Sequence, residues 1–207
     1  MRCVPESKNP RAPGLIVAAL LIGGGIFYAV PIAARAAGIR VYAWIFTALT
    51  LACVVAAVFL LVRYRMTGFQ YIIRPRAEAE DSGLVTAYAA GARLNAEDLP
   101  PEMLDFVVIR SQGAHPGAME CVLGLDDLTA VYTVRRKKKD GLTRSELREK
   151  YARDGEYVSY DYTVTLAPDD SLGLVFIDGR KYVGIFIEPD ARMRAYFTAL
   201  KPEEKGD

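Results

Sequence analysis

The sequence predicts an α-helical membrane hairpin followed by a mainly-β (α+β) domain that ends in a helix. Two charge-free apolar runs lie close together near the amino terminus, at 12–34 and 41–62. The remainder of the chain breaks into short β-like runs separated by turn residues. Four apolar residues near the carboxyl end then recur at helical spacing: Met193, Tyr196, Phe197 and Leu200.

Each apolar run is long enough to cross a hydrocarbon core of about 30 Å, which takes roughly 20 helical residues. Neither run has the polar stripe that a helix on the surface of a soluble protein would carry. A buried soluble hairpin and a cleaved signal peptide are the alternatives. The length of the first run, and the second run that begins at Val41, both favour an uncleaved hairpin.

Basic residues predict how this hairpin is oriented. They gather before the first run (Arg2, Lys8, Arg11) and after the second (Arg63, Arg65, Arg74, Arg76). Only Arg35 and Arg40 lie in the connecting turn. Cytoplasmic flanks collect Lys and Arg. We therefore expect a multi-pass protein of the cell membrane with both termini in the cytoplasm.

Small residues recur every fourth position in both runs. They are Gly25, Ala29 and Ala33 in the first run, and Ala48, Ala52 and Ala56 in the second. Such faces allow close approach of helices in lipid. We expect them to pack the two helices of the hairpin together, because the connecting turn is short. A homo-oligomer interface through the same faces is the alternative.

The part of the chain after the hairpin predicts six or seven short strands in a small antiparallel barrel or sandwich. Segment 157–166 alternates, with Tyr160 and Tyr162 on the apolar face. Asp178-Gly179 divides two apolar strands, which is typical of a hairpin turn. A capping box in segment 143–155 predicts a short helix. Pro189 and Asp190 are start signals for the terminal helix.

Three segments resemble bacterial pleckstrin-homology-like (PH-like) domains found after a transmembrane hairpin. "YRMTGFQYII" is similar to a first strand that enters from the membrane, and "CVLGLDDLTAVYTV" to two mid-domain strands around an acidic turn. "GRKYVGIFIEPDARMRAYFTAL" resembles the last strand and the helix that closes the barrel. The resemblance implies a PH-like small barrel with no general catalytic residue.

The predicted organisation follows from these segments. Residues 1–13 form a cytoplasmic tail, and 14–63 the hairpin, with helices at about 14–34 and 41–63. Residues 64–201 form the cytoplasmic PH-like domain, and 202–207 a polar tail. The segments 76–104 and 140–155 are longer than a compact PH-like domain needs.

One surface feature stands out, the run of five cations Arg135, Arg136, Lys137, Lys138 and Lys139. The acidic balance of the surrounding domain and the absence of a nucleic-acid-binding motif argue against nucleic acid. A solvated strand end and a contact with membrane lipids both fit the run, because a short tether keeps the domain near the bilayer.

The sequence carries no motif that points to catalysis. The single histidine, His115, lies in a loop phrase without a partner at triad or ligand spacing. The three cysteines are too widely spaced for a disulfide framework or a metal site. We predict neither enzyme activity nor a cofactor.

The predicted function is a non-enzymatic integral membrane protein. Its cytosolic domain would bind a protein partner or the membrane surface. An accessory or regulatory subunit of a membrane enzyme or signalling system is the alternative.

Overall fold

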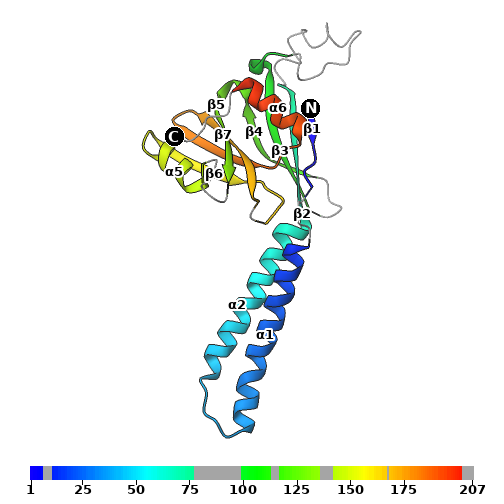
Figure 1. Cartoon of the computed structure of the whole chain (residues 1–207), viewed down its shortest axis with the longest axis vertical. Helices are drawn as coiled ribbons and strands as arrows, with labels where there is room; N and C mark the ends of the chain where they lie inside the picture. Colours follow the sequence, from blue (N-terminus) through cyan, green and yellow to red (C-terminus); the bar gives the residue numbers. More distant parts are fainter. Residues whose placement is uncertain (7–10, 77–98, 113–116, 136–141, 167, 202–207) are drawn as a thin grey trace. The chain divides into compact units, whose positions relative to one another are not determined.

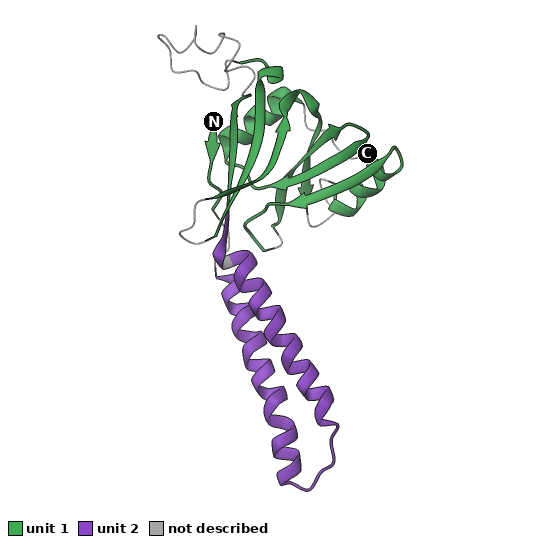
Figure 2. Ribbon diagram, turned by 180° about the vertical axis from the view of Figure 1, so that it is seen from behind, with its two compact units in different colours: residues 1–6, 69–207 green, residues 7–68 purple. Residues whose placement is uncertain are grey.

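The structure is a computed structural model that describes residues 1–6, 11–76, 99–112, 117–135, 142–166 and 168–201. The chain divides into two compact units (Figure 2). One unit contains residues 7–68, and the other contains residues 1–6 together with 69–207. Residues 1–6 therefore belong to the same unit as the carboxyl-terminal region, although they precede the helices in the sequence.

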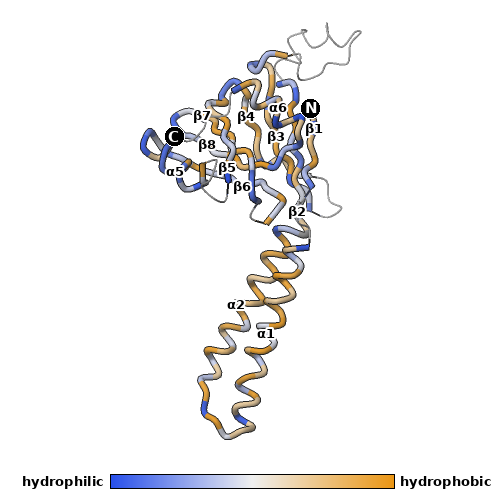
Figure 3. The backbone as a smooth tube through the Cα atoms, viewed as in Figure 1, coloured by the Kyte–Doolittle hydropathy of each residue, from blue (hydrophilic) through white to orange (hydrophobic). Residues whose placement is uncertain are grey.

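The unit of residues 7–68 is a hairpin of two long helices, α1 (Ala12–Ala36) and α2 (Ala43–Leu61). Both are long and apolar enough to cross a membrane, and Figure 3 shows apolar residues along both. At 1.5 Å per residue their lengths are roughly 37 Å and 28 Å. The two predicted spans are confirmed as helices. α1 continues through Pro31 and ends two residues beyond the predicted boundary.

A π-helical turn (Val62–Met66) follows α2 and leads directly into the first long strand. The hydroxyl of Thr67 donates to the carbonyl of Val62 at 2.9 Å, which satisfies one of the carbonyls at the end of the helix.

The first sheet of the β-rich unit has the strand order β1-β2-β3-β4 (Figure 1). Its strands are β1 (Arg2–Cys3), β2 (Thr67–Pro75), β3 (Leu104–Gln112) and β4 (Ala118–Gly124). β1 pairs antiparallel with β2, and β3 pairs antiparallel with β4. The sequence predicts a tail for residues 1–13. The structure instead places a strand at its start.

The second sheet has the order β5-β7-β8-β6. Its strands are β5 (Leu128–Arg135), β6 (Glu156–Asp161), β7 (Asp170–Asp178) and β8 (Lys181–Ile187). The 3-10 turn Leu125–Asp127 joins β4 to β5, which confirms the predicted acidic turn. Gly179, with φ of 62°, forms the predicted turn between β7 and β8.

The prediction of a wholly antiparallel barrel is wrong at one strand pair, because β6 lies parallel to β8. The cause is the helix α5 (Arg144–Ala152), which lies between β5 and β6 in the chain. It carries the chain across the sheet to the opposite edge, and parallel strands need a crossover of this kind. The predicted capping box of Thr143 and Glu146 is present at the start of α5.

The main core lies between the two sheets and includes the terminal helix α6 (Ala191–Leu200). Met193 and Phe197 of α6 are fully buried in it, as the helical spacing predicts. A second apolar cluster covers the other face of the second sheet and includes Leu147 and Tyr151 of α5. β7 has apolar contacts on both faces, which explains its almost continuous apolar sequence.

The alternating pattern of 157–166 predicts a single long strand, and this prediction is wrong beyond Asp161. β6 ends there, and the chain turns so that Thr163 and Thr165 become buried. Tyr162 is buried as expected, but Tyr160 is 46% exposed. Thr163 and Thr165, which alternate with the apolar face in the sequence, therefore lie inside the unit.

Candidate functional site

The basic run begins at the end of β5. Arg135 is the last residue of that strand, and its backbone N–H donates to the carbonyl of Leu142 at 3.1 Å. Val134 and Leu142 form an isolated parallel bridge, so the residues on either side of the segment that carries the run lie next to each other. Arg136, Lys137, Lys138 and Lys139 lie outside the described residues, as does His115. Lipid contact by the run stays a prediction.

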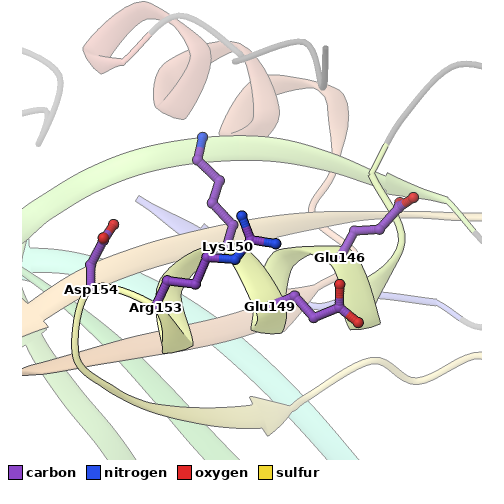
Figure 4. Close-up of a pocket in the computed structure, with 5 residues that line it drawn as sticks. All are labelled: Glu146, Glu149, Lys150, Arg153 and Asp154. Carbon is purple, nitrogen blue, oxygen red and sulfur yellow. The ribbon is translucent and has the colours of Figure 1, made fainter.

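An open pocket of about 360 Å³ lies beside α5 (Figure 4). The side chains that line it are Glu146, Glu149, Lys150, Arg153 and Asp154. Two of these already have structural roles. Glu146 closes the capping box, and the Lys150 ammonium donates to the Tyr132 hydroxyl at 2.8 Å. The pocket therefore presents side chains of both charges from α5 and from the turn that follows it.

A tyrosine cluster lies beneath α5, next to that pocket. The hydroxyls of Tyr132 and Tyr151 are 2.9 Å apart, and the Lys150 ammonium lies 5.1 Å from the centroid of the Tyr132 ring. Burial raises the pKa of Tyr157 to about 12. Its hydroxyl lies where a side chain at position 184 would start, so only Gly184 leaves room for it. We assign this cluster to packing, because the ring of Tyr151 contacts the rings of both Tyr132 and Tyr157.

The most elaborate polar arrangement lies where β2, β8, the segment after β6 and the start of α6 meet. We call it the corner network, and it comprises Cys3, Tyr71, Tyr162, Val164, Thr165, Glu188 and Asp190. The carboxylate of Glu188 accepts from the backbone N–H groups of Val164 at 2.8 Å and Thr165 at 2.7 Å. These bonds hold the segment after β6 in its buried position.

Tyr71 links the two sheets within the corner network. Its hydroxyl donates to the carbonyl of Tyr162 at 2.8 Å and accepts from the N–H of Glu188 at 3.3 Å. Burial raises the pKa of Tyr71 far above its ordinary value, so the phenol stays neutral. Cys3 enters the network from β1, where its sulfur accepts from the N–H of Asp190 at 3.3 Å. Burial raises the pKa of this thiol as well.

A second polar arrangement clamps the end of β2 to the turn between β4 and β5. The Arg76 guanidinium contacts Asp105 at 3.0 Å and Asp126 at 2.7 Å. The hydrogen bond from Arg76 holds the pKa of Asp126 below its usual range. Burial and the neighbouring Asp126 raise the pKa of Asp127. The predicted turn role of Asp126 and Asp127 is confirmed.

The small-residue faces of the hairpin do not lie where the sequence places them. Gly25, Ala29 and Ala33 are exposed on α1, and Ala48 and Ala52 are exposed on α2, with Ala56 half-buried. The seam instead includes Gly24, where an added Cβ would lie 3.3 Å from the Cβ of Cys53. Thr50 donates to the Gly24 carbonyl at 3.2 Å. Packing of the hairpin through Gly25, Ala29 and Ala33 is therefore wrong.

Sequence reasoning missed the corner network. Apart from the Tyr71 hydroxyl, its donors are backbone N–H groups, and the groups that pair come from distant segments, so no local motif marks it. Glu188 follows an apolar strand directly, which is its sole signal in the sequence. Within the described part of the chain, no group of three or more His, Cys, Asp or Glu side chains is placed to hold a metal ion.

No protein-family model, no curated protein and no solved structure matches this chain.

Proposed function

We propose that this chain is a non-enzymatic integral membrane protein whose β-rich, PH-like domain is an interaction module on the cytoplasmic side. The module would bind a protein partner or the membrane surface. The proposal has two parts, the anchoring by the hairpin and the role of the domain, and different observations support each.

The length and apolar character of α1 and α2 support the anchoring, and one further observation carries its topology. Residues on both sides of the hairpin pair in the same sheet, because Arg2 lies opposite Ile72 and Cys3 opposite Tyr71. A chain that enters and leaves a membrane between two paired strands must cross it an even number of times. The two helices supply two crossings, so both flanks would lie on the same side.

Side chains near the helix ends support the same arrangement. Tyr42 and Trp44 lie at the start of α2 and are exposed, as aromatic residues are at membrane interfaces. The flanks of the hairpin carry seven basic residues and its turn carries two, Arg35 and Arg40, and this excess favours cytoplasmic flanks. The exposed faces of Gly25, Ala29 and Ala33 and of Ala48 and Ala52 remain open to a homo-oligomer in lipid.

The proposed role of the domain rests on two features. Two sheets with a closing carboxyl-terminal helix are compatible with a PH-like domain. The basic run of five cations begins at Arg135, the last residue of β5, next to the Val134–Leu142 bridge. Each cation near an anionic leaflet contributes about 1 kcal/mol, so three lysines would change vesicle affinity by a factor of about 100.

A hairpin-free variant tests the lipid contact without an anchor. Because β1 and β2 are antiparallel neighbours, a short Asn-Gly-containing linker can join Glu6 to Thr67 and keep β1 in place. A fragment that starts after the hairpin would lack this strand. Binding to phosphatidylglycerol vesicles is measured by sedimentation, for this variant and for its K137E/K138E/K139E form.

The matched control reverses three exposed cations elsewhere, Arg148, Arg153 and Arg180. We expect the lysine reversal to abolish vesicle binding and the control to retain it. Equal losses in both would indicate unspecific attraction and contradict the lipid role of the run. Release of the full-length chain from membranes by alkaline carbonate would contradict the anchoring.

A further inference from the structure

We propose that residues 1–4 form an amino-terminal strap with two states, docked on the edge of β2 or released from it. In the docked state, the strap closes that edge and completes the corner network. In the released state, the backbone edge of β2 is unpaired. The proposal does not depend on which side of a membrane the unit lies.

The docked strap is held by backbone and side-chain contacts. The backbone nitrogen of Met1 donates to the carbonyl of Ile73 at 2.7 Å, and the N–H of Ile73 donates to the carbonyl of Met1 at 2.8 Å. The Arg2 guanidinium donates to the side-chain oxygen of Gln70 at 2.7 Å. These contacts define a single register, with Arg2 opposite Ile72.

Cys3 anchors the strap in the main core. Its side chain is 3% exposed and lies in the cluster that also contains Tyr71 and Met193. Its sulfur accepts from the N–H of Asp190, and the Asp190 carboxylate caps α6 through the N–H of Met193 at 2.7 Å. The strap therefore contacts the residue that begins the terminal helix.

The sequence of the strap disfavours two neighbouring registers. A slip of one residue that brings Arg2 opposite Tyr71 would put its guanidinium where the Cys3 side chain is buried, because strand side chains alternate between faces. Burial of a cation carries a large desolvation penalty. A slip of two residues that brings Pro5 opposite Tyr71 would place it at a paired position, and proline cannot donate to the ladder. The sequence therefore favours the register with Cys3 opposite Tyr71 over these two slips.

Release is a local event because the strap is short. Two residues form β1, whereas β7 and β8 pair over seven residues. β2 stays paired with β3 when the strap leaves. Elements with few buried contacts open with less free energy than the rest of the fold. These features are therefore more typical of a strand that can dock and leave than of a permanent strand of the sheet.

Hydrogen exchange of the full-length chain in detergent tests the switch. The swap variant R2C/C3R keeps the composition but places arginine at the buried position. We expect the amide of Ile73 to exchange at least tenfold faster in the swap variant than in the unmodified chain. The matched control is V4T, at an exposed position of the strap, and it should leave the exchange of Ile73 unchanged. The amides of β7 and β8 should exchange at the same rate in all variants.

A disulfide lock completes the test in a C3A/C53A/C121A background. R2C/I72C should form a disulfide on oxidation. The Ile73 amide should then exchange more slowly than in the same background without the two new cysteines. R2C/R74C, which is off register by two residues, should not crosslink. Failure of the R2C/I72C disulfide to form would overturn docking. If the disulfide does not slow exchange of the Ile73 amide, the released state would be overturned. If exchange in the swap variant is faster in every strand, the whole fold depends on β1, and release as a local event would also be overturned.

Discussion

The hairpin and the β-rich unit use the same apolar residue types in opposite ways. On the helices, Ile22, Leu51 and Phe59 are each more than 60% exposed. In the β-rich unit, Leu172 and Leu174 are completely buried. The helices thus expose the same types of apolar side chain that the β-rich unit buries.

This difference is what the proposed membrane anchoring of the hairpin predicts. A soluble domain rarely exposes a contiguous apolar surface of this extent, whereas lipid chains accept it without cost. The hairpin buries only a narrow seam that includes Gly24 and Ala57, so under the proposed anchoring its stability would come from insertion rather than from a core. Mutations should therefore act by different rules in the two units.

The largest expected effect is loss of a core aromatic residue. Phe197 is fully buried, with its ring centroid 5.5 Å from that of Phe106. F197A should lower the free energy of unfolding of the β-rich unit by about 3 to 5 kcal/mol, because truncation leaves a cavity. Denaturant unfolding in detergent measures this. Y28A, which removes an exposed aromatic residue of α1, should leave the transition of the β-rich unit in place; a matching loss would contradict the comparison.

The second-largest effect is expected when a charge is placed on the exposed surface of α2. L51R puts a cation in the middle of α2 and should cost about 2.5 to 3.5 kcal/mol of membrane insertion. The fraction of chain inserted in a microsomal translation assay reports this cost. I177R makes the same change at an exposed position of β7 and should insert normally. Equal insertion of both variants would argue that α2 does not cross the bilayer.

Loss of the Glu188 carboxylate should have an intermediate effect. E188A leaves the N–H groups of Val164 and Thr165 buried without their acceptor, which costs roughly 1 to 3 kcal/mol. The midpoint temperature of thermal unfolding should fall accordingly. E149A, at an exposed position of α5, should change stability by less than about 0.5 kcal/mol. Should the two variants unfold alike, the corner network would not be a stabilising element.

The smallest effect concerns the pH dependence of the Arg76 clamp. The pKa of Asp126 is depressed below its ordinary value of 3.8, chiefly by the hydrogen bond from Arg76. Its contribution to stability is fully present above pH 3.8 and is lost as pH falls through the folded pKa. Between pH 4 and pH 2, the free energy of unfolding should fall less for D126N than for the unmodified chain, by a difference of at most about 1 kcal/mol. An unchanged pH profile would contradict the clamp.

The sequence was sufficient where local patterns decide the structure. Charge-free runs predict both helices, Asp178-Gly179 predicts the β7–β8 turn, and Thr143 with Glu146 predicts the cap of α5. It was insufficient where distant segments decide. The strand β1 consists of two residues, too short for any periodicity, and it exists because β2 offers an edge and a site for Cys3.

The candidate site was less predictable than the fold for the same reason. Thr163 and Thr165 alternate with apolar residues and look solvent-facing, but Glu188 draws their segment into the corner network. Gly25, Ala29 and Ala33 repeat every fourth residue, yet the seam of the hairpin includes Gly24. The seam is set by how the two helices face each other, which a repeat within one helix does not specify.

The central claim is that both flanks of the hairpin lie on one side of the membrane and its turn lies on the other. The most direct measurement uses single cysteines in a cysteine-free chain, V4C, I39C and T129C, at three exposed positions. A membrane-impermeant maleimide is applied to sealed vesicles of one orientation. We predict that V4C and T129C react from the same side and I39C only from the opposite side. Reaction of V4C together with I39C, and not with T129C, would contradict the account.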